Sequence, residues 1–588
     1  MAGRGLRTLF ALAAAWCALG ATAVAQDKQP TAVGAGGAAA TVDATATQAA
    51  IDSLRAGGNA VDAAVAAAAV LGVTEPFSAG IGGGGFMVIR TAKGRVTTID
   101  HRELSPAAMT PTSFIENGAP LAFSDARYSG LSAGVPGTVA GWSEALKRYG
   151  TWSLGRALQP GIRVAREGFV VDQTFHEQTA PNVPWFDDVP STEAIYLDAD
   201  GTPRDVGSVL RNPDLARTYE LIARGGVKAF YRGPIADAIV AATTAPPIAA
   251  DADHTWRPGS MTDRDLKKYT APERAATRVG YRGLDVFGMG PPSSGGSTVG
   301  EALNILEGYD DLGADRTRAL HLFLEASRLS FADRGTYLAD PAFFKVPLRG
   351  LLSDGFAAER RELIDETKAA TSPVAAGDPY PYEGGKKFKK RVKVKTSGDK
   401  GRSTTHLVVS DRRGNVVSYT FTIESTGGNG IVVPGYGFLL NNELTDFNFD
   451  STTHPNRADG SKRPRSSMSP TIVLDDGRPF LALGSPGGST IITTVLQVLM
   501  ERVDLGRSLP DAIAAPRATQ RNTATTLAEA AFASSPEGHA LATQYGHRFG
   551  PSPEIGAVTA LEFLGDGRVL AAAEPVRRGG GSAAVEQP

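Results

Sequence analysis

Cysteine is nearly absent from this chain, since Cys17 is the only one in 588 residues. Cys17 lies in the apolar stretch 9–19, which we interpret as part of a signal peptide (residues 1–25) that export would remove. The mature chain would then contain no cysteine. This excludes disulfide bonds, a cysteine nucleophile and cysteine-based metal sites. Stability must therefore come from burial of a core, which a chain of this length can provide.

The sequence also has little net charge and no second long apolar run. The formal net charge is -2, and loss of the two positive charges of Arg4 and Arg7 with the signal peptide would make it about -4, which gives no reason to expect binding to nucleic acid. Beyond the signal peptide, no apolar stretch reaches the roughly 20 residues that a membrane span needs. An uncleaved membrane anchor is the alternative to cleavage, but the stretch 9–19 is short for one. We therefore expect a periplasmic or secreted protein without a stable membrane span.

The common sequence motifs of cofactor and metal sites are missing. Glycine-rich segments such as 82–85 and 295–296 do not continue into the Gly-Lys-Ser/Thr signature of a phosphate-binding loop. The eight histidines show no His-Glu-x-x-His spacing. We therefore predict no metal and no organic cofactor.

The patterns that are present predict mixed α/β content. The alanine-rich segment 49–71 indicates helices on either side of a break at Gly57 and Gly58, and residues 320–333 place apolar side chains at helical spacing. Both segments are expected to serve packing rather than function.

Two strand-like segments flank a short turn in the last third of the chain. Segments 404–410 and 416–423 have the composition of strands, and the five residues between them have the length and the glycine of a hairpin loop. If the strand ends next to the turn pair with each other, Thr404 lies directly opposite Thr422. Opposed residues on one face of such a pair have Cβ atoms about 5 Å apart. Their hydroxyl groups would then be within reach of a hydrogen bond.

Thr404 itself follows a polar, glycine-containing stretch, 397–403. A threonine hydroxyl is a weak nucleophile, and one way to activate it is to make the residue N-terminal, so that its own α-amine acts as the general base. That requires cleavage of the backbone between Ser403 and Thr404. Threonine is also common at strand starts for structural reasons, so the catalytic interpretation depends on the segments that accompany it.

Three glycine- and serine-rich turns farther along offer the other groups that amide cleavage needs. Gly487 and Gly488 let backbone N–H groups approach a tetrahedral oxyanion without a side chain in the way. Ser466 and Ser467 offer two hydroxyl donors to a carboxylate, and Asp446 offers a charge partner for an ammonium. Each segment alone is better explained as a turn between strands, but together they predict an amide-cleaving site.

The order and combination of these segments resemble the γ-glutamyltransferase proenzymes, which are N-terminal nucleophile hydrolases. The resemblance covers almost the whole chain after the signal peptide and includes the blocks 57–65, 75–84, 102–106, 135–138, 291–296 and 332–334. It implies a four-layer αββα sandwich formed jointly by two autocleaved subunits that remain together as a heterodimer. The large subunit would comprise residues 26–403, with 371–403 as a flexible linker or tail, and the small catalytic subunit would comprise 404–588.

The resemblance also implies the roles of the residues around the cleaved bond. Thr404 would attack the carbonyl of Ser403 to cut the chain and would then serve as the nucleophile. Thr422 would orient this nucleophile, and Gly487 with Gly488 would form the oxyanion hole.

A second set of residues would recognise the free amino-acid end of a γ-glutamyl group. Arg102, Ser466 and Ser467 match the family's clamp on the substrate α-carboxylate, and Glu443 and Asp446 match the positions that hold the α-ammonium. Because this clamp draws on both the N-terminal and the C-terminal thirds of the chain, we expect one fold rather than separate domains.

Glu424 departs from the family pattern, because many members have asparagine there. A carboxylate in place of an amide adds a negative charge and removes two donors. It could hold the ammonium of Thr404 or of the substrate, or it could raise the pKa of the nucleophile's amine. The stretch 446–466 is also shorter than in members with a long lid, so we expect a more open cleft.

These observations predict an exported, autoprocessed γ-glutamyltransferase. It would transfer the γ-glutamyl group of glutathione and related amides, through an ester on Thr404, to water or to amino-acid and peptide acceptors. Two alternatives remain open. One is a cephalosporin or glutaryl-type acylase of the same superfamily, whose substrate lacks the α-amine, and the other is an inactive exported binding homologue.

Overall fold

The computed structural model describes residues 27–384 and 403–587. The expected signal peptide and residues 385–402 of the expected linker therefore lie outside the described residues. The described part of that linker, 371–384, packs on the rest of the protein, where the N–H of Gly377 donates to Asp333 at 2.6 Å. Within the described ranges, no helix is both long enough and apolar enough to cross a membrane.

A sheet of 13 strands forms the centre of the molecule, and its strand pairs are antiparallel. Its strands follow one another in the order β8 (Glu273–Arg274), β3 (Val96–Asp100), β2 (Gly84–Arg90), β12 (Val416–Thr422), β11 (Thr405–Ser410), β1 (Thr31–Thr41), β19 (Val569–Ala573), β18 (Thr559–Phe563), β14 (Arg478–Gly484), β13 (Thr471–Asp475), β10 (Leu284–Gly288) and β9 (Thr277–Tyr281). A further strand, β20 (Ser582–Gln587), also pairs with β1.

The long strand β1 joins the two halves of this sheet. Its residues 31–34 pair with β19, whereas its residues 38–40 pair with β11. Between them the pairing with β20 shifts register, and Gly36 has a φ of +88°, which glycine adopts at little cost. Strand β11 also contacts β14 and β18, and β12 contacts β14, although these are not their neighbours in strand order. The sheet therefore bends back over itself at β1.

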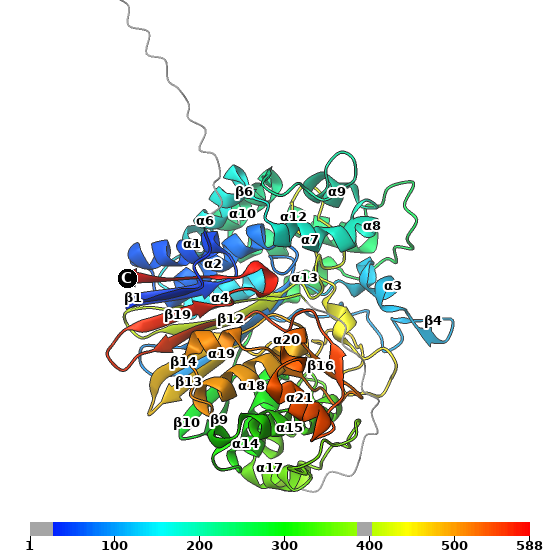
Figure 1. Cartoon of the computed structure of the whole chain (residues 1–588). Coiled ribbons are helices and arrows are strands. Elements are labelled where there is room, and N and C mark those ends of the chain that lie inside the picture. Colours follow the sequence, from blue (N-terminus) through cyan, green and yellow to red (C-terminus); the bar gives the residue numbers. More distant parts are fainter. Residues whose placement is uncertain (1–26, 385–402, 588) are drawn as a thin grey trace, which may run out of the picture.

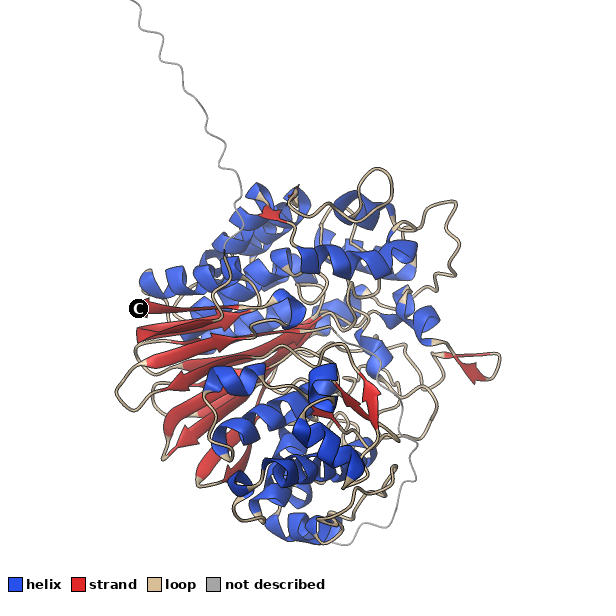
Figure 2. Ribbon diagram, in the orientation of Figure 1, coloured by secondary structure: helices blue, strands red, loops and turns tan. Residues whose placement is uncertain are grey.

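Helices cover the strands on two sides, as Figures 1 and 2 show. On one side, α2 (Ala60–Thr74) contacts β11 and β12 and lies beside α1 (Ala44–Arg55). On the other, α14 (Gly295–Glu307) contacts β9 and β10, and α18 (Thr490–Val503) contacts β14. The remaining longer helices are α4 (Thr138–Tyr149), α6 (Gln159–Glu167), α10 (Pro213–Gly225), α12 (Pro234–Thr244), α15 (Arg316–Tyr337), α17 (Asp354–Arg361) and α21 (Pro536–Thr543).

The helices expected from the sequence are present. The alanine-rich segment forms α1 and α2, separated at Gly57, where φ is +87°. Asn59 caps α2, accepting hydrogen bonds from the backbone of its first turn, and Asp62 completes the capping box. The segment 320–333 lies inside α15. The predicted α/β class is therefore confirmed, with a large antiparallel sheet as its core.

Strand β11 is buried on both faces. Leu407 and Val409 belong to a hydrophobic cluster that includes residues of α1 and α2, whereas Val408 belongs to a second cluster with residues of α14 and α18. Successive side chains of a strand point to opposite faces, so both faces of β11 contribute to a core. The residue just before β11, Thr404, therefore stands at the edge of both hydrophobic clusters.

Candidate active site

The predicted hairpin and its register are confirmed. Strands β11 and β12 are antiparallel, and Ser410 is the partner of Val416. This register carries Thr404 opposite Thr422, and the hydroxyl of Thr404 donates a hydrogen bond to Oγ1 of Thr422 at 3.1 Å. Only 4% of Thr404 is exposed.

The backbone on both sides of the expected cleavage point is firmly held. Thr404 has a φ of +111°, which is costly for a β-branched residue. The hydroxyl of Ser403 lies 3.0 Å from both the carbonyl oxygen of Phe77 and Oγ of Ser78. The carbonyl of Thr404 accepts a hydrogen bond from Arg578 at 2.7 Å. The strained backbone at Thr404 therefore lies between two groups held by hydrogen bonds, the hydroxyl of Ser403 and the carbonyl of Thr404.

Arg578 is a functional candidate that sequence reasoning missed. It lies in the short helix η6 (Arg577–Gly579), with a φ of +56°, and its second guanidinium nitrogen donates to Ser78 at 2.8 Å. Burial lowers the pKa of Arg578, while the carboxylates of Glu75 and Glu554 oppose that shift. Two consecutive arginines in a glycine-rich tail carry no motif that could have indicated this position.

Thr422 is itself oriented by the residue two positions later. Its Oγ1 accepts a second hydrogen bond, from the backbone N–H of Glu424 at 2.8 Å. Glu424 has a φ of +79°, an uncommon conformation for a residue other than glycine. The tight turn after β12 therefore places an N–H donor on the hydroxyl that contacts Thr404.

The side chain of Glu424 is buried and hydrogen-bonded. Its Oε2 accepts from Oγ of Ser425 at 2.5 Å and from the amide nitrogen of Asn442. Burial raises the pKa of Glu424 well above its usual range, and the carboxylates of Asp446 and Glu443 raise it further. Glu424 therefore keeps its proton to a higher pH than an exposed glutamate does.

Arg102 and the two expected ammonium partners form one cluster. Arg102, which is 1% exposed, follows β3 and pairs with Glu443 and with Asp446, the latter at 2.5 Å. It also donates to the backbone carbonyls of Pro464 and Arg465. Of the two carboxylates, the side chain of Asp446 is 29% exposed and that of Glu443 is 1% exposed. The fold thus brings residues from both ends of the chain into contact, as expected, and Asp446 is the member that reaches solvent.

Asn442 connects this cluster to the hairpin. Its backbone N–H donates to the carbonyl of Ile423 at 3.2 Å, and its side-chain oxygen accepts from the N–H of Ser425 at 3.0 Å. Asn442 immediately precedes the short helix η5 (Glu443–Asp446). Hydrogen bonds of Asn442 therefore link the segment that carries these carboxylates to the residues that follow β12.

The two predicted serines lie in the loop that Arg102 contacts. Ser466 is held through its carbonyl, which accepts from the N–H of Ser294 at 2.8 Å. Oγ of Ser467 accepts from Arg334 of α15 at 2.6 Å, and Arg334 also donates to Oγ of Ser294 at 2.8 Å. Arg334 lies in a block that contributed to the family resemblance, but no role was predicted for it.

The glycines of the expected oxyanion hole lie between β14 and α18. Gly487 has a φ of +131° and Gly488 a φ of +58°, and a Cβ on Gly487 would lie 2.5 Å from Oγ1 of Thr490. The last residue of β14, Gly484, packs so closely on His406 that a Cβ there would meet the imidazole ring at 2.3 Å. Because His406 is two residues after the nucleophile candidate, the glycine loop begins at that end of β11. Any other residue would be strained at the positive φ of Gly487 or Gly488, so both positions favour glycine.

Known proteins resemble this chain over most of its length. A family model described as gamma-glutamyltranspeptidase matches residues 46–584. The glutathione hydrolase proenzyme of Escherichia coli (strain K12) is 37% identical over 559 residues, which cover 92% of this chain and 90% of that protein. The acylase ACY 1 proenzyme of Pseudomonas sp. (strain SE83) is 36% identical over 561 residues, covering 93% of each. The crystal structure of cephalosporin acylase from Bacillus halodurans superposes with a TM-score of 0.80 at 28% identity, covering 95% of this chain and 97% of that one. The chain is therefore an enzyme of the gamma-glutamyltranspeptidase family.

Proposed function

We propose that this protein is an exported enzyme that first cuts its own chain before Thr404 and then cleaves γ-glutamyl amides, among them glutathione. The observation that carries the proposal is the hydrogen bond of 3.1 Å between the hydroxyls of Thr404 and Thr422, at the buried end of β11. It supports a nucleophile whose hydroxyl is already oriented in the uncut chain.

In the autoprocessing step, Oγ1 of Thr404 attacks the carbonyl carbon of Ser403. The C–N bond breaks, the hydroxyl proton passes to the departing amine, and an ester joins Ser403 to Oγ1. Water then hydrolyses this ester and leaves a large subunit, 26–403, and a small subunit, 404–588. The φ of +111° at Thr404 favours this step, because cleavage removes the peptide that imposes the strain.

In the catalytic step, the new α-amine of Thr404 accepts the proton of its own hydroxyl as Oγ1 attacks the γ-carbonyl of the substrate. Backbone N–H groups of Gly487 and Gly488 would stabilise the oxyanion. The amine of the substrate leaves with the proton, and a γ-glutamyl ester remains on Thr404. Attack by water gives hydrolysis, and attack by the amine of an amino acid or peptide gives transfer.

The Arg102 cluster supports recognition of a free amino-acid end. An α-carboxylate would bind the guanidinium of Arg102 with Ser466 and Ser467, while an α-ammonium would bind Glu443 and Asp446. A zwitterion offers one group of each sign, so it can replace the pairing between Arg102 and the carboxylates without leaving a buried charge uncompensated. Glu424 lies beside these carboxylates, where a nearby ammonium would favour its charged form.

The fold supports the same proposal. The contacts of β11 with β14 and β18, those of β12 with β14, and the helices on both outer sides are consistent with a four-layer αββα sandwich. Groups of strands that precede Ser403 lie between groups of strands that follow it in the sheet. Two subunits produced by the cut would therefore stay together as a heterodimer.

An acylase that acts on glutaryl substrates is the second candidate, and the acylases among the relatives are the observation that favours it. Such a substrate lacks the α-amine, so Glu443 and Asp446 would have no ammonium to bind. The presence of these two carboxylates therefore favours the γ-glutamyl substrate.

One experiment tests both steps. The intact mass of the purified protein is measured for the wild type, for Thr404→Ala, and for the control Thr405→Ala, whose hydroxyl is buried and makes no hydrogen bond with any described residue. We expect two fragments meeting at residues 403 and 404 in the wild type and the control, and one uncut chain in Thr404→Ala. An uncut wild-type chain would exclude the proposed mechanism.

The same samples are then assayed on γ-glutamyl and glutaryl anilides, which differ only in the α-amine. Faster release from the γ-glutamyl anilide supports the proposal. Faster release from the glutaryl anilide assigns the site to an acylase, and processing without any turnover assigns the chain to the inactive homologues.

A further inference from the structure

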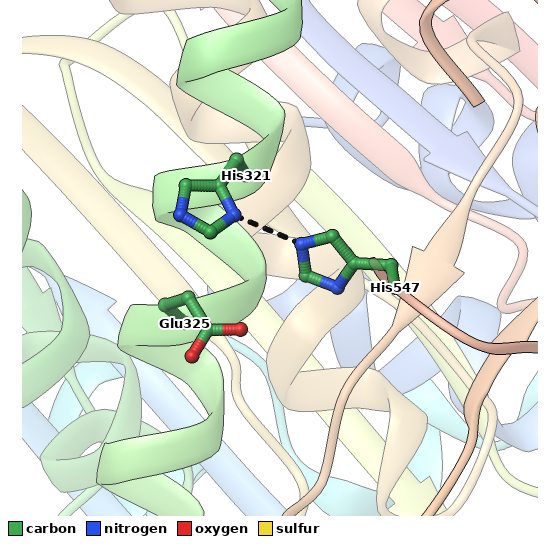
Figure 3. A group of neighbouring side chains, drawn as sticks. All are labelled: His321, Glu325 and His547. Carbon is green, nitrogen blue, oxygen red and sulfur yellow. Dashed lines mark hydrogen bonds between the residues drawn. The ribbon is translucent and has the colours of Figure 1, made fainter. Parts of the chain in front are cut away.

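A buried group of two histidines and a glutamate lies on α15 and beside β17 (Phe549–Pro551). His321 and Glu325 are one turn apart on α15, and His547 precedes β17 (Figure 3). Their exposed fractions are 0%, 2% and 4%. No step of the proposed reaction uses these side chains.

The potential ligand atoms of this group converge. Nδ1 of His321 lies 2.9 Å from Nε2 of His547, and these two atoms and a carboxylate oxygen of Glu325 all lie within 4.8 Å of one another. Residues four apart on a helix share one face, so α15 presents His321 and Glu325 together toward His547.

The orientation of His321 is that of a metal ligand. Its Nε2 lies 2.8 Å from the backbone carbonyl of Asp365, so this nitrogen is assigned as the N–H donor. In the neutral ring, Nδ1 then carries a lone pair that points at His547. Metal-binding histidines commonly fix their tautomer through such an N–H···O=C bond.

Glu325 is positioned by two neighbours, Arg328 and the backbone of Ala370. Its carboxylate accepts from Nη2 of Arg328 at 3.0 Å, from Nε of Arg328 at 3.2 and 3.3 Å, and from the N–H of Ala370 at 3.2 Å. An ionised carboxylate has about four lone-pair sites, so a metal ion would bind Glu325 by displacing a long contact from Nε of Arg328. Because the guanidinium of Arg328 competes for the same group, we expect Glu325 to be the weakest of the three ligands.

We propose that Nδ1 of His321, Nε2 of His547 and a carboxylate oxygen of Glu325 form a site for a divalent transition-metal ion such as Zn²⁺, with a fourth position for water. Zinc–nitrogen bonds of about 2.0 to 2.1 Å in tetrahedral geometry place two nitrogen ligands about 3.3 Å apart. The two rings would therefore have to separate by only about 0.4 Å from their present 2.9 Å.

The site would be structural. Two of its ligands precede residue 403 and one follows it, so the ion would link the two subunits of the cleaved enzyme, a consequence that rests on the proposed function. The metal site itself does not depend on cleavage, because the three side chains already converge in the uncut chain.

The test uses full-length protein stripped with EDTA and titrated with Zn²⁺, with bound metal measured by mass spectrometry at equilibrium. Co²⁺ in place of Zn²⁺ gives a visible absorption that reports tetrahedral coordination. We expect one equivalent of metal in the wild type, binding at least about tenfold weaker in Glu325→Gln, and loss of the site in His547→Gln. His539→Gln alters an exposed histidine and is expected to bind like the wild type.

The uncut Thr404→Ala protein is titrated in parallel and is expected to bind one equivalent as well, so the metal site is tested independently of processing and turnover. Wild-type protein that binds Zn²⁺ no more tightly than His547→Gln would overturn the inference. The close contact of His321 with His547 would then be a hydrogen bond between two rings and nothing more.

Discussion

Replacing Thr422 with valine would remove a hydroxyl that makes two buried hydrogen bonds without changing the shape of the side chain. One is the bond of 3.1 Å from the hydroxyl of Thr404, and the other is the bond of 2.8 Å from the N–H of Glu424. Loss of the second leaves a buried N–H donor without a partner, which costs about 1 to 3 kcal/mol of stability. Loss of the first frees the proposed nucleophile to rotate, and a neutral hydrogen bond of about 1 kcal/mol corresponds to about a fivefold lower rate.

The matched control is Thr420→Val. Thr420 lies two residues earlier on β12, and its hydroxyl also makes a buried hydrogen bond, to His406 at 2.7 Å. Both variants should lose stability, but only Thr422→Val should slow the appearance of the two fragments and the turnover of a γ-glutamyl anilide. Thr422→Ser, which keeps the hydroxyl, should largely restore both rates. Equal rates of processing and turnover in Thr422→Val and Thr420→Val would refute the orienting role of this hydroxyl.

Three further changes address the remaining parts of the site. Arg578→Met removes the hydrogen bond of 2.7 Å to the carbonyl of Thr404 and should slow processing about tenfold, since a charged hydrogen bond contributes about 1.5 to 3 kcal/mol. The control Arg568→Met, at the surface, should process normally. Comparable fragment yields over time from the two variants would count against this role of Arg578. Glu424→Gln keeps the shape of the neutral acid. Burial raises the pKa of Glu424, so the folded protein holds a proton that the unfolded chain releases above its ordinary pKa, and the stability of the wild type falls as pH rises. In thermal melts, the stability of Glu424→Gln relative to the wild type should therefore increase between pH 5 and pH 8. A relative stability that decreases with rising pH would contradict the protonated state of Glu424. Asp446→Asn removes a proposed partner of the substrate ammonium and should raise KM for γ-glutamyl anilide about tenfold, while turnover of the glutaryl anilide should be unchanged. An equal effect on the two substrates would argue against ammonium binding at Asp446.

The parts of the site that follow local rules could be predicted from the sequence. The register of β11 and β12 follows from the five-residue turn between two strand-like segments, and it fixes Thr404 opposite Thr422. The contact of Arg102 with residues of the last third followed from the resemblance rather than from any pattern in its own segment. Even so, the sequence did not indicate that Arg102 would pair with the carboxylates expected to bind the ammonium.

Other features depend on tertiary proximity that no local pattern encodes. Arg578 reaches the carbonyl of Thr404 from a turn 174 residues later. His321 and Glu325 have a spacing that a helix makes meaningful, but their third neighbour, His547, is 226 residues from His321. The effect of Glu424 also depended on burial, because the charge expected from its sequence is disfavoured once the side chain leaves water.

The way β1 is shared has a consequence for how the cleaved enzyme would behave. This strand precedes residue 403, yet its three partners, β11, β19 and β20, all follow it. After the cut, every one of these ladders would join the two polypeptides, so they could part only by losing the hydrogen bonds at the middle of the sheet. The pair should therefore neither dissociate on dilution nor exchange subunits with other copies while it is folded. It should melt in one transition, at a temperature that rises with protein concentration because unfolding releases two separate chains.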